Sequence, residues 1–294
     1  MKNVINYYYN LYPENIFQSK DEYYFFINNI RYSFIEYKED IKKIEKIYNM
    51  HLDILKKNMY VHSIILNKDG KPLTIIKEVP YILMQTLYYG ENIDIRNILS
   101  FFNIEANTNK EITWEELWKN KNDYIEYQIK LLGDKYKLLK ESVYYYLGLG
   151  ENAIELLNIT NPKNIKMYYT HNRIDKKRTS FDLYNPLNII IDTKVRDIAE
   201  YLKQNFFKGE NIEKDLEYYL KTENLNPAEH ILFFSRLLYP TYFYDLIEKI
   251  IRNEKEEKEV LNIIGKVDEY ESILKKLYKY YKTFINIPVI EWLE

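Results

Sequence analysis

The chain contains no cysteine and no long apolar run. The absence of cysteine among its 294 residues excludes a disulfide, a thiolate metal site and a cysteine nucleophile. No window approaches the roughly 18 apolar residues of a membrane-spanning helix. The first residues, MKNVINYYYNLYPENIF, lack the apolar core of a signal peptide. We therefore expect synthesis and folding in the cytoplasm, without a signal peptide and without a membrane span.

Glycine is also scarce, and the first of the seven glycines is Gly70. No glycine-rich turn can therefore accompany the first strands of the chain. Kinases use such a turn because only glycine lets the backbone approach phosphate oxygens closely. The sequence also lacks a Walker lysine loop and a Gly-x-Ser-x-Gly motif, and its four histidines are scattered without metal-binding spacing.

Neither sign of charge dominates the composition. There are 42 Lys and Arg against 44 Asp and Glu, a net charge of −2, which gives no sequence-wide attraction to nucleic acid or anionic lipid. What is abundant is tyrosine, with 32 residues. Together with many Lys, Ile and Asn, this abundance is typical of an AT-rich coding sequence. The alternative is a tyrosine-rich surface suited to assembly, because Tyr has an apolar body and a polar tip.

The first ninety residues have a mixed α/β pattern. EYYFFINNIRYSFIEY, residues 22–37, contains two β-rich runs around Asn28-Asn29, which predicts a hairpin. EDIKKIEKIYNMHLDILKK, residues 39–57, has the apolar spacing of a helix. Residues 59–90 return to strands, with a turn at Asp69-Gly70 and an interruption at Pro80.

The rest of the chain has a predominantly helical pattern. Thr113 and Glu116 form a capping box for one helix, and Gly133 stands where that helix would end. The next segment, LLKESVYYYLGLGENAIELLN, reads as two helices jointed at Gly148 and Gly150. We expect an α+β protein with a small β-rich lobe, residues 1–91, and a larger helical lobe, residues 92–294.

One stretch of the helical half contains strand-like runs: KMYYTHNRIDKKRTSFDLYNPLNIIIDTKVRDIAEYL, residues 166–202. The first run ends at Thr170-His171. The second, Asn188 to Ile191, ends in Asp192, and Arg196-Asp197 then opens a helical segment.

Three segments in this order carry a family resemblance. They are YYYLGLGENAIELL (residues 144–157), DTKVRDIAEYLK (192–203) and SRLLYPTYFYDLIEKI (235–250). The chain resembles the aminoglycoside-phosphotransferase branch of the protein-kinase-like fold. More closely, it is similar to the spore-coat-associated kinase-like proteins of Gram-positive spore formers, the YutH and CotS type. The resemblance implies a two-lobed fold and a place in the spore coat with other coat proteins as partners, but no known reaction.

The resemblance also indicates where a phosphotransferase site would lie. His171-Asn172-Arg173 places Arg173 where the family pattern has the catalytic aspartate. A guanidinium stays protonated and cannot accept a proton from an acceptor hydroxyl. In this alignment the base is therefore lost and Arg173 is left as an anion-binding residue. His171 either fixes the turn or joins Arg173 in binding a nucleotide or another anion. Lys176-Lys177-Arg178 adds a short basic patch beside it.

A second alignment stays open. FDLYNPLN, residues 181–188, resembles the family's Gly-Asp-Leu-His-Pro-Gly-Asn, with Asp182 as the base and Asn188 as a metal or nucleotide ligand. Its spacing is one residue too long. Asp192 would then follow Asn188 by only four positions, which leaves little chain for the intervening hairpin.

Asp192 matches the metal-holding acid of the family in either alignment, because it ends an apolar β-like run. Alone it would hold Mg²⁺ weakly, since Mg²⁺ needs another anion or a phosphate alongside. We assign Asp197 a structural role as the cap of the helix IAEYL. A strand lysine for the phosphates is missing, because Arg31 and Lys38 only flank the run RYSFIEYK.

Three functions follow. The favoured one is a degenerate kinase that acts as a binding or assembly component of the spore coat, without enzymatic activity. The alternative is a divergent small-molecule phosphotransferase that uses ATP and Mg²⁺ to phosphorylate an alcohol group. The third is a tyrosine-rich structural coat component that self-associates.

Overall fold

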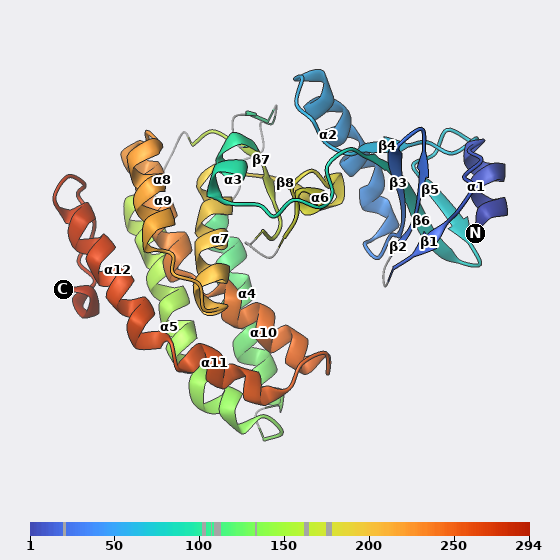
Figure 1. Ribbon diagram of the computed structural model, residues 1–294. Coiled ribbons are helices and arrows are strands. Elements are labelled where there is room, and N and C mark those ends of the chain that lie inside the picture. Colours follow the sequence, from blue (N-terminus) through green and yellow to red (C-terminus); the bar gives the residue numbers. More distant parts are fainter. Residues whose placement is uncertain are drawn as a thin grey trace. The chain divides into compact units, whose positions relative to one another are not determined.

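The computed structural model describes residues 1–19, 22–101, 104–106, 108, 113–132, 134–161, 165–174 and 178–294 (Figure 1). The chain separates into two compact units by its internal contacts. Unit 1 comprises Met1–Asp94 and Lys176–Ile190, and unit 2 comprises Ile95–Asp175 and Ile191–Glu294. The lobe boundary between residues 91 and 92 stays a prediction.

Unit 1 is built on an antiparallel sheet. The strands are β1 (Phe17–Gln18), β2 (Glu22–Ile27), β3 (Ile30–Glu36), β4 (Ser63–Ile65), β5 (Leu73–Ile76) and β6 (Val79–Thr86). Their spatial order is β1-β2-β3-β6-β4, and β5 also pairs with β6. The order of a hairpin, a helix and further strands agrees with the sequence pattern, whereas β1 and the N-terminal helix α1 (Lys2–Tyr9) were not predicted.

Of the turns in this sheet, the sequence predicted the one between β2 and β3 but not the one between β5 and β6. Asn28 and Asn29 have φ of 49° and 62°, the left-handed values that a two-residue hairpin turn requires, so the β2–β3 hairpin is confirmed. Lys77 and Glu78 adopt similar φ values of 47° and 69° between β5 and β6, with no Asn or Gly to indicate the turn. The interruption expected at Pro80 is wrong. Pro80 is the second residue of β6, where its carbonyl still accepts from the Tyr37 amide at 2.8 Å.

Helices cover both faces of the sheet. Neighbouring residues of a strand point to opposite faces, and on β6 Ile82 and Leu83 belong to two different core clusters. The cluster around Ile82 includes Ile44 and Ile47 of α2 (Ile44–Lys56). The cluster around Leu83 includes Ile5 of α1.

A distant segment completes the core on the α2 side. It contains the short helix α6 (Ser180–Leu183) and the 3-10 turn η2 (Pro186–Asn188). Phe181 and Leu187 of this segment pack against the cluster that contains α2, and the His62 amide donates to the Tyr184 carbonyl at 2.9 Å. The segment therefore belongs to unit 1 although it lies far along the chain.

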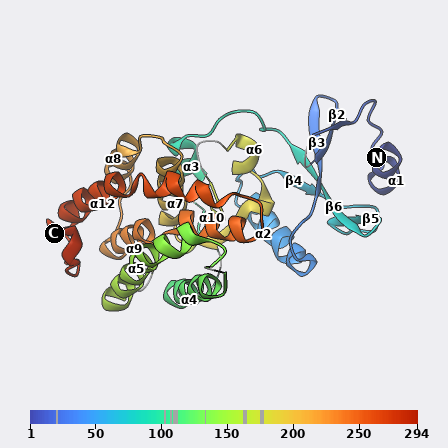
Figure 2. The same ribbon diagram turned by 90° about the horizontal axis from the view of Figure 1, so that it is seen from below.

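Unit 2 is mainly helical (Figures 1 and 2). Its helices are α3 (Ile95–Phe101), α4 (Trp114–Leu132), α5 (Lys137–Thr160), α7 (Val195–Phe207), α8 (Glu213–Thr222), α9 (Pro227–Leu238), α10 (Thr241–Ile251), α11 (Val260–Ile264) and α12 (Val267–Lys282). Helix α5 packs against α4 and α9, and α9 packs against α7. Strands β7 (Tyr168–His171) and β8 (Ile189–Asp192), both expected from the sequence, pair with each other, and the boundary between the units falls within β8, after Ile190. No helix of the described residues has the length and apolar character that spanning a membrane would require.

The expected joint at Gly148 and Gly150 is wrong, because α5 runs unbroken through both residues. Gly150 serves close packing instead. A Cβ atom there would lie 2.7 Å from the Asn122 side chain and 3.0 Å from the Tyr244 hydroxyl. Glycine thus lets α4 and α10 approach α5 closely. The helix end expected at Gly133 lies outside the described residues.

Candidate functional site

Asp192 ends β8 in unit 2, and both of its carboxylate oxygens accept hydrogen bonds. Oδ1 accepts from the Trp114 indole at 3.0 Å, from the Thr193 amide at 2.7 Å and from the Arg236 guanidinium. Oδ2 accepts from the Arg196 guanidinium at 3.0 Å. The Asp192 side chain is only 6% exposed and that of Arg236 only 2%.

The charges around Asp192 keep it ionised. Burial alone would raise the pKa of this carboxyl group, but the guanidinium groups of Arg236 and then Arg196 outweigh burial and hold its pKa below the usual range. Asp192 is thus a buried anion that is paired with two cations. Its oxygens are directed to protein donors rather than toward an open coordination position.

His171 ends β7 and is tied to α7 by Asp197. The His171 amide donates to both carboxylate oxygens of Asp197, at 2.8 and 3.0 Å, and Nδ1 of the ring contacts the same carboxylate. Both side chains are fully buried. The prediction that Asp197 caps a helix is wrong, because α7 begins at Val195 and Asp197 lies inside its first turn. There its negative charge is compatible with the positive end of the helix dipole.

Arg173 follows two residues later and forms a bidentate ion pair with Asp245 of α10. Its Nε donates to Oδ2 at 2.7 Å and its Nη2 donates to Oδ1 at 2.8 Å. The third nitrogen of the fork, Nη1, donates to the Asn172 carbonyl at 2.8 Å. Such fork-to-fork pairing fixes the guanidinium plane. The arginine at the expected base position is therefore directed to a protein carboxylate.

The residues of the second alignment lie in unit 1. Asp182 closes a capping box at the start of α6, where it accepts from the Thr179 amide at 3.1 Å, and it pairs with Arg178 at 3.3 Å. Asn188 ends η2, and its amide group donates to the Asp182 carbonyl at 3.5 Å. The structure thus brings Asp182 and Asn188 together in one short segment, while Lys176 and Lys177 lie outside the described residues.

The cation at the start of β3 is also engaged. Arg31 pairs with Glu22, and its guanidinium carbon lies 4.5 Å from the ring centre of Tyr24 and 4.7 Å from that of Tyr89. This stacking between two rings and a carboxylate is a stable place for an arginine.

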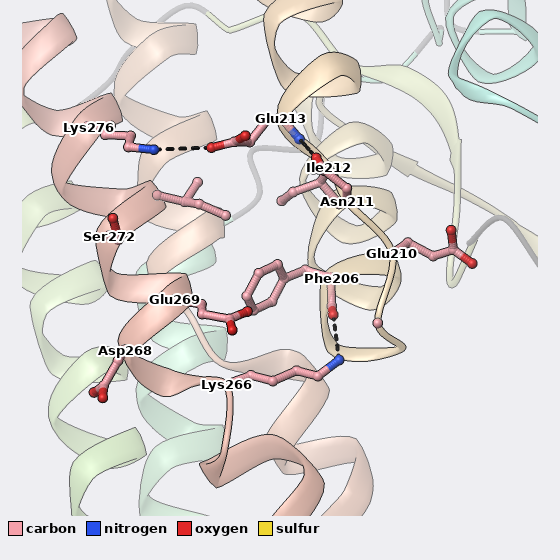
Figure 3. Close-up of a pocket in the computed structure, with 12 residues that line it drawn as sticks. Phe206, Glu210, Asn211, Ile212, Glu213, Lys266, Asp268, Glu269, Ser272 and Lys276 are labelled. Atoms are coloured by element: carbon pink, nitrogen blue, oxygen red, sulfur yellow. Dashed lines mark hydrogen bonds and ion pairs between the residues drawn. The ribbon is translucent and has the colours of Figure 1, made fainter.

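No group of three or more acidic or histidine side chains within the described ranges is arranged to hold a metal ion. A pocket of about 720 Å³ lies elsewhere in unit 2, between the α7–α8 connection and α12 (Figure 3). Both lysines on its wall are engaged: Lys276 pairs with Glu213 at 3.1 Å, and Lys266 donates to the Phe206 carbonyl at 3.1 Å. None of the candidate site residues lines this pocket.

A second buried ion pair lies within α7. The Lys203 ammonium group donates to Glu200 at 3.0 Å, to the Tyr239 carbonyl at 2.9 Å and to the Arg236 carbonyl. These two carbonyls stand at the end of α9, where a helix lacks internal donors. The second oxygen of Glu200 accepts from the Thr241 hydroxyl at 2.7 Å. Lys203 therefore joins α7 to the end of α9 in the core of unit 2.

We expect Glu200 to make stability depend on pH in the acidic range. Burial would raise its pKa, but the positive charges of Lys203, Arg173 and Arg196 together outweigh burial and lower the pKa from 4.5 to about 2. A carboxyl whose pKa is depressed by folding stabilises the fold above about pH 4.5, and this contribution is lost as the pH falls toward 2. Two to three pKa units correspond to about 3 kcal/mol. Urea titrations of the wild type and of Glu200→Gln should show a gap in unfolding free energy that is largest at pH 7 and narrows below pH 4.5. A gap that is constant with pH would contradict this assignment.

Sequence reasoning missed the partners that decide this site. Arg236, Arg196 and Asp245 lie inside the segments quoted for the family resemblance, but their pairing with Asp192 and Arg173 was not predicted. Arg196, four positions after Asp192, was a signal close in the sequence, whereas Arg236 and Asp245 lie far along the chain from the residues that they pair with.

Solved structures of phosphotransferases share this fold. An aminoglycoside phosphotransferase from Alicyclobacillus acidocaldarius matches with a TM-score of 0.67 and 10% identity, over 92% of this chain and 93% of that one. A spectinomycin phosphotransferase, solved with ADP and spectinomycin, matches with a TM-score of 0.59 and 10% identity, over 90% and 93%. The choline kinase LicA from Streptococcus pneumoniae matches with a TM-score of 0.53 and 11% identity, over 92% and 97%. The two-lobed, protein-kinase-like α+β fold predicted from the sequence is thereby confirmed.

Within this class, residues 2–280 match the model of the family described as "Spore coat putative kinase YutH", and the chain belongs to that family. A curated relative is the endospore coat-associated protein YutH of Bacillus subtilis (strain 168), which is 24% identical over 206 residues. The match covers 61% of this chain and 61% of that relative, less than two thirds of its length.

Proposed function

We propose that the protein is a kinase-like scaffold of the spore coat that binds or assembles coat components and transfers no phosphate. The family and its coat-associated relative support the place of action. The proposed lack of phosphoryl transfer rests on the contacts of the Asp192 carboxylate. Its oxygens are engaged by two arginines, an indole and a backbone amide.

This arrangement opposes metal binding on energetic grounds. Phosphoryl transfer depends on Mg²⁺ ions that bridge phosphate oxygens and are held by carboxylates. For Asp192 to hold Mg²⁺, the divalent ion would have to displace the guanidinium groups of Arg236 and Arg196. Arg236 is buried, so its displacement would leave a desolvated cation without its partner.

The state of Arg173 supports the same proposal. In the alignment that places it at the base position, it cannot take a proton from an acceptor hydroxyl. Its bidentate pair with Asp245 makes it a structural residue of unit 2. Because Arg173 is already paired with the Asp245 carboxylate, it is a poor candidate for binding an anionic ligand.

Thermal melts with ATP, ADP and GTP, with and without Mg²⁺, test the proposal. At about a hundred times its dissociation constant, a ligand adds roughly 2.7 kcal/mol to the stability of the protein it binds. For a chain of this size that is a shift of several degrees. We expect no Mg²⁺-dependent shift at millimolar nucleotide. A spectinomycin phosphotransferase measured under the same conditions is the positive control.

A Mg²⁺-dependent shift would overturn the proposal, most clearly if Asp182→Asn or Asn188→Ala removed it. It would favour the alternative, a divergent phosphotransferase that uses Mg²⁺ and ATP on a small molecule with an alcohol group. Asp182→Asn keeps an oxygen that can accept from the Thr179 amide, so the helix cap is preserved while the charge is removed.

A further inference from the structure

Helix α4 carries two apolar faces, of which only one is buried. The buried face consists of Trp118, Asn122, Ile125 and Ile129. The other face consists of Leu117, Tyr124, Tyr127 and Leu131, which we call the outer stripe. These side chains are 57%, 43%, 58% and 61% exposed. A helix at the surface of a globular protein normally has one apolar stripe and a polar opposite face.

The outer stripe has the repeat of a helix-pairing surface. Leu117, Tyr124 and Leu131 are separated by seven residues each. Tyr127 fills the intermediate position three residues after Tyr124, and the equivalent position after Leu117 is the polar Asn120. A seven-residue repeat of apolar side chains at these two positions keeps one side of a helix facing a partner helix. Charged residues of α4 fill most of the surface between the two faces, so the outer stripe is not an extension of the core.

Leu117 and Leu131 of the outer stripe lie seven residues to either side of Tyr124, whereas the position that mirrors Tyr127 is Lys121. If two copies of α4 run antiparallel with the axis at Tyr124, Leu117 of each copy faces Leu131 of the other, and the two tyrosine rings meet at the centre. Figure 2 shows α4 at the periphery of the helical unit, beside α5. The Lys121 ammonium group lies 5.2 Å from the Tyr124 ring centre, so one face of that ring is already covered.

The flanking charges select the same orientation. Glu116 and Lys130 lie on one side of the stripe, about 40° apart around the helix and fourteen residues apart along the chain. Antiparallel pairing therefore brings Glu116 of each copy to Lys130 of the other. Within one copy Glu116 accepts from the Thr113 hydroxyl at 3.1 Å and Lys130 pairs with Glu126 at 2.8 Å. Both contacts are at the surface and exchange easily. Asp123 lies near the axis, where it would repel Asp123 of the second copy. This repulsion weakens the dimer, but the Glu116–Lys130 contacts still favour the antiparallel orientation.

We propose that the outer stripe of α4 binds the outer stripe of a second copy of this chain, antiparallel, to form a twofold dimer. A closed twofold interface uses one self-complementary patch on both subunits. A single pair of helices of about 28 Å is at the small end of specific interfaces, so the dimer should dissociate in the micromolar range. The surface does not include Asp192 or Arg173, and the dimer is independent of the proposed function.

Sedimentation velocity of the full chain between about 1 and 200 µM tests the dimer. We expect a monomer–dimer equilibrium that Tyr127→Lys weakens at least tenfold. The matched control is Leu261→Lys, a substitution of a leucine on α11 that is 52% exposed and lies outside the stripe. Circular dichroism checks that both variants keep the fold. A monomer throughout, or a dimer that Tyr127→Lys leaves unchanged, would overturn the proposal.

Charge reversal tests the antiparallel orientation. Glu116→Lys and Lys130→Glu should each weaken the dimer several-fold, because each places like charges together across the interface. The double variant restores opposite charges, and we expect it to return to within about twofold of the wild-type dissociation constant. Failure of the double variant to recover would contradict the antiparallel pairing of these two residues.

Discussion

Replacing Asp192 by alanine is expected to lower the midpoint of thermal unfolding by on the order of 10 °C. The substitution leaves the buried Arg236 guanidinium without its carboxylate and removes an acceptor from Arg196 and Trp114. Breaking a buried ion pair by removing one partner costs about 3–5 kcal/mol, and each kcal/mol shifts the midpoint by about 2–4 °C in a large domain. Differential scanning calorimetry at pH 7 measures the change.

The sign of the stability change in Asp192→Ala tests whether Asp192 supports the fold or is kept for a metal site. Residues kept for function are often held at a cost, so their removal leaves stability unchanged or increases it. A metal-holding aspartate without its metal would belong to that group. The double substitution Asp192→Leu with Arg236→Met removes both charges and should be less damaging than the sum of the single changes. A single variant as stable as the wild type would show that Asp192 does not support the fold.

Replacing Lys203 by methionine should be similarly damaging. Methionine keeps much of the apolar stem but leaves the Glu200 carboxylate buried without its cation and two carbonyls at the end of α9 without a donor. Burial lowers the pKa of Lys203 to about 8, so the ammonium form is present at neutral pH. We expect a loss of about 3–5 kcal/mol, measured by urea titration at pH 7.

The matched control for this experiment is Lys276→Met. Lys276 pairs with Glu213 at the surface, and both side chains are more than half exposed. Exposed pairs contribute about 0–1 kcal/mol, so this variant should be close to the wild type. Adding Glu200→Gln to Lys203→Met should recover part of the loss, since it removes the unpaired charge. Equal effects of the buried and the exposed substitution would contradict the role assigned to Lys203.

Local signals were sufficient for the features that depend on neighbouring residues. Asn28-Asn29 indicated a hairpin because asparagine tolerates positive φ, and the apolar run before Asp192 indicated a strand. The partners of the site depend on tertiary packing instead. Arg236 reaches Asp192 across 44 positions and Asp245 reaches Arg173 across 72. No periodicity or motif predicts such pairs.

Gly150 also shows that a role set by tertiary packing cannot be predicted from the local sequence. Gly150 was interpreted as a joint, because a glycine inside a helical pattern suggests a break when only the sequence is read. Its actual role depends on Asn122 and Tyr244, which belong to two other helices. A residue that exists to make room for distant neighbours carries no sign of them in its own segment.

The order of synthesis sets a condition on how unit 1 can fold. Residues 1–94 leave the ribosome well before residues 176–190, which supply Phe181 and Leu187 to the core on the α2 side. At about 5–20 residues per second, the delay is roughly 5–20 s. During that time this side of the nascent sheet is covered by α2 but lacks Phe181 and Leu187. The N-terminal unit therefore cannot be completed cotranslationally from its own contiguous segment, and a fragment that stops at residue 94 would be prone to aggregate.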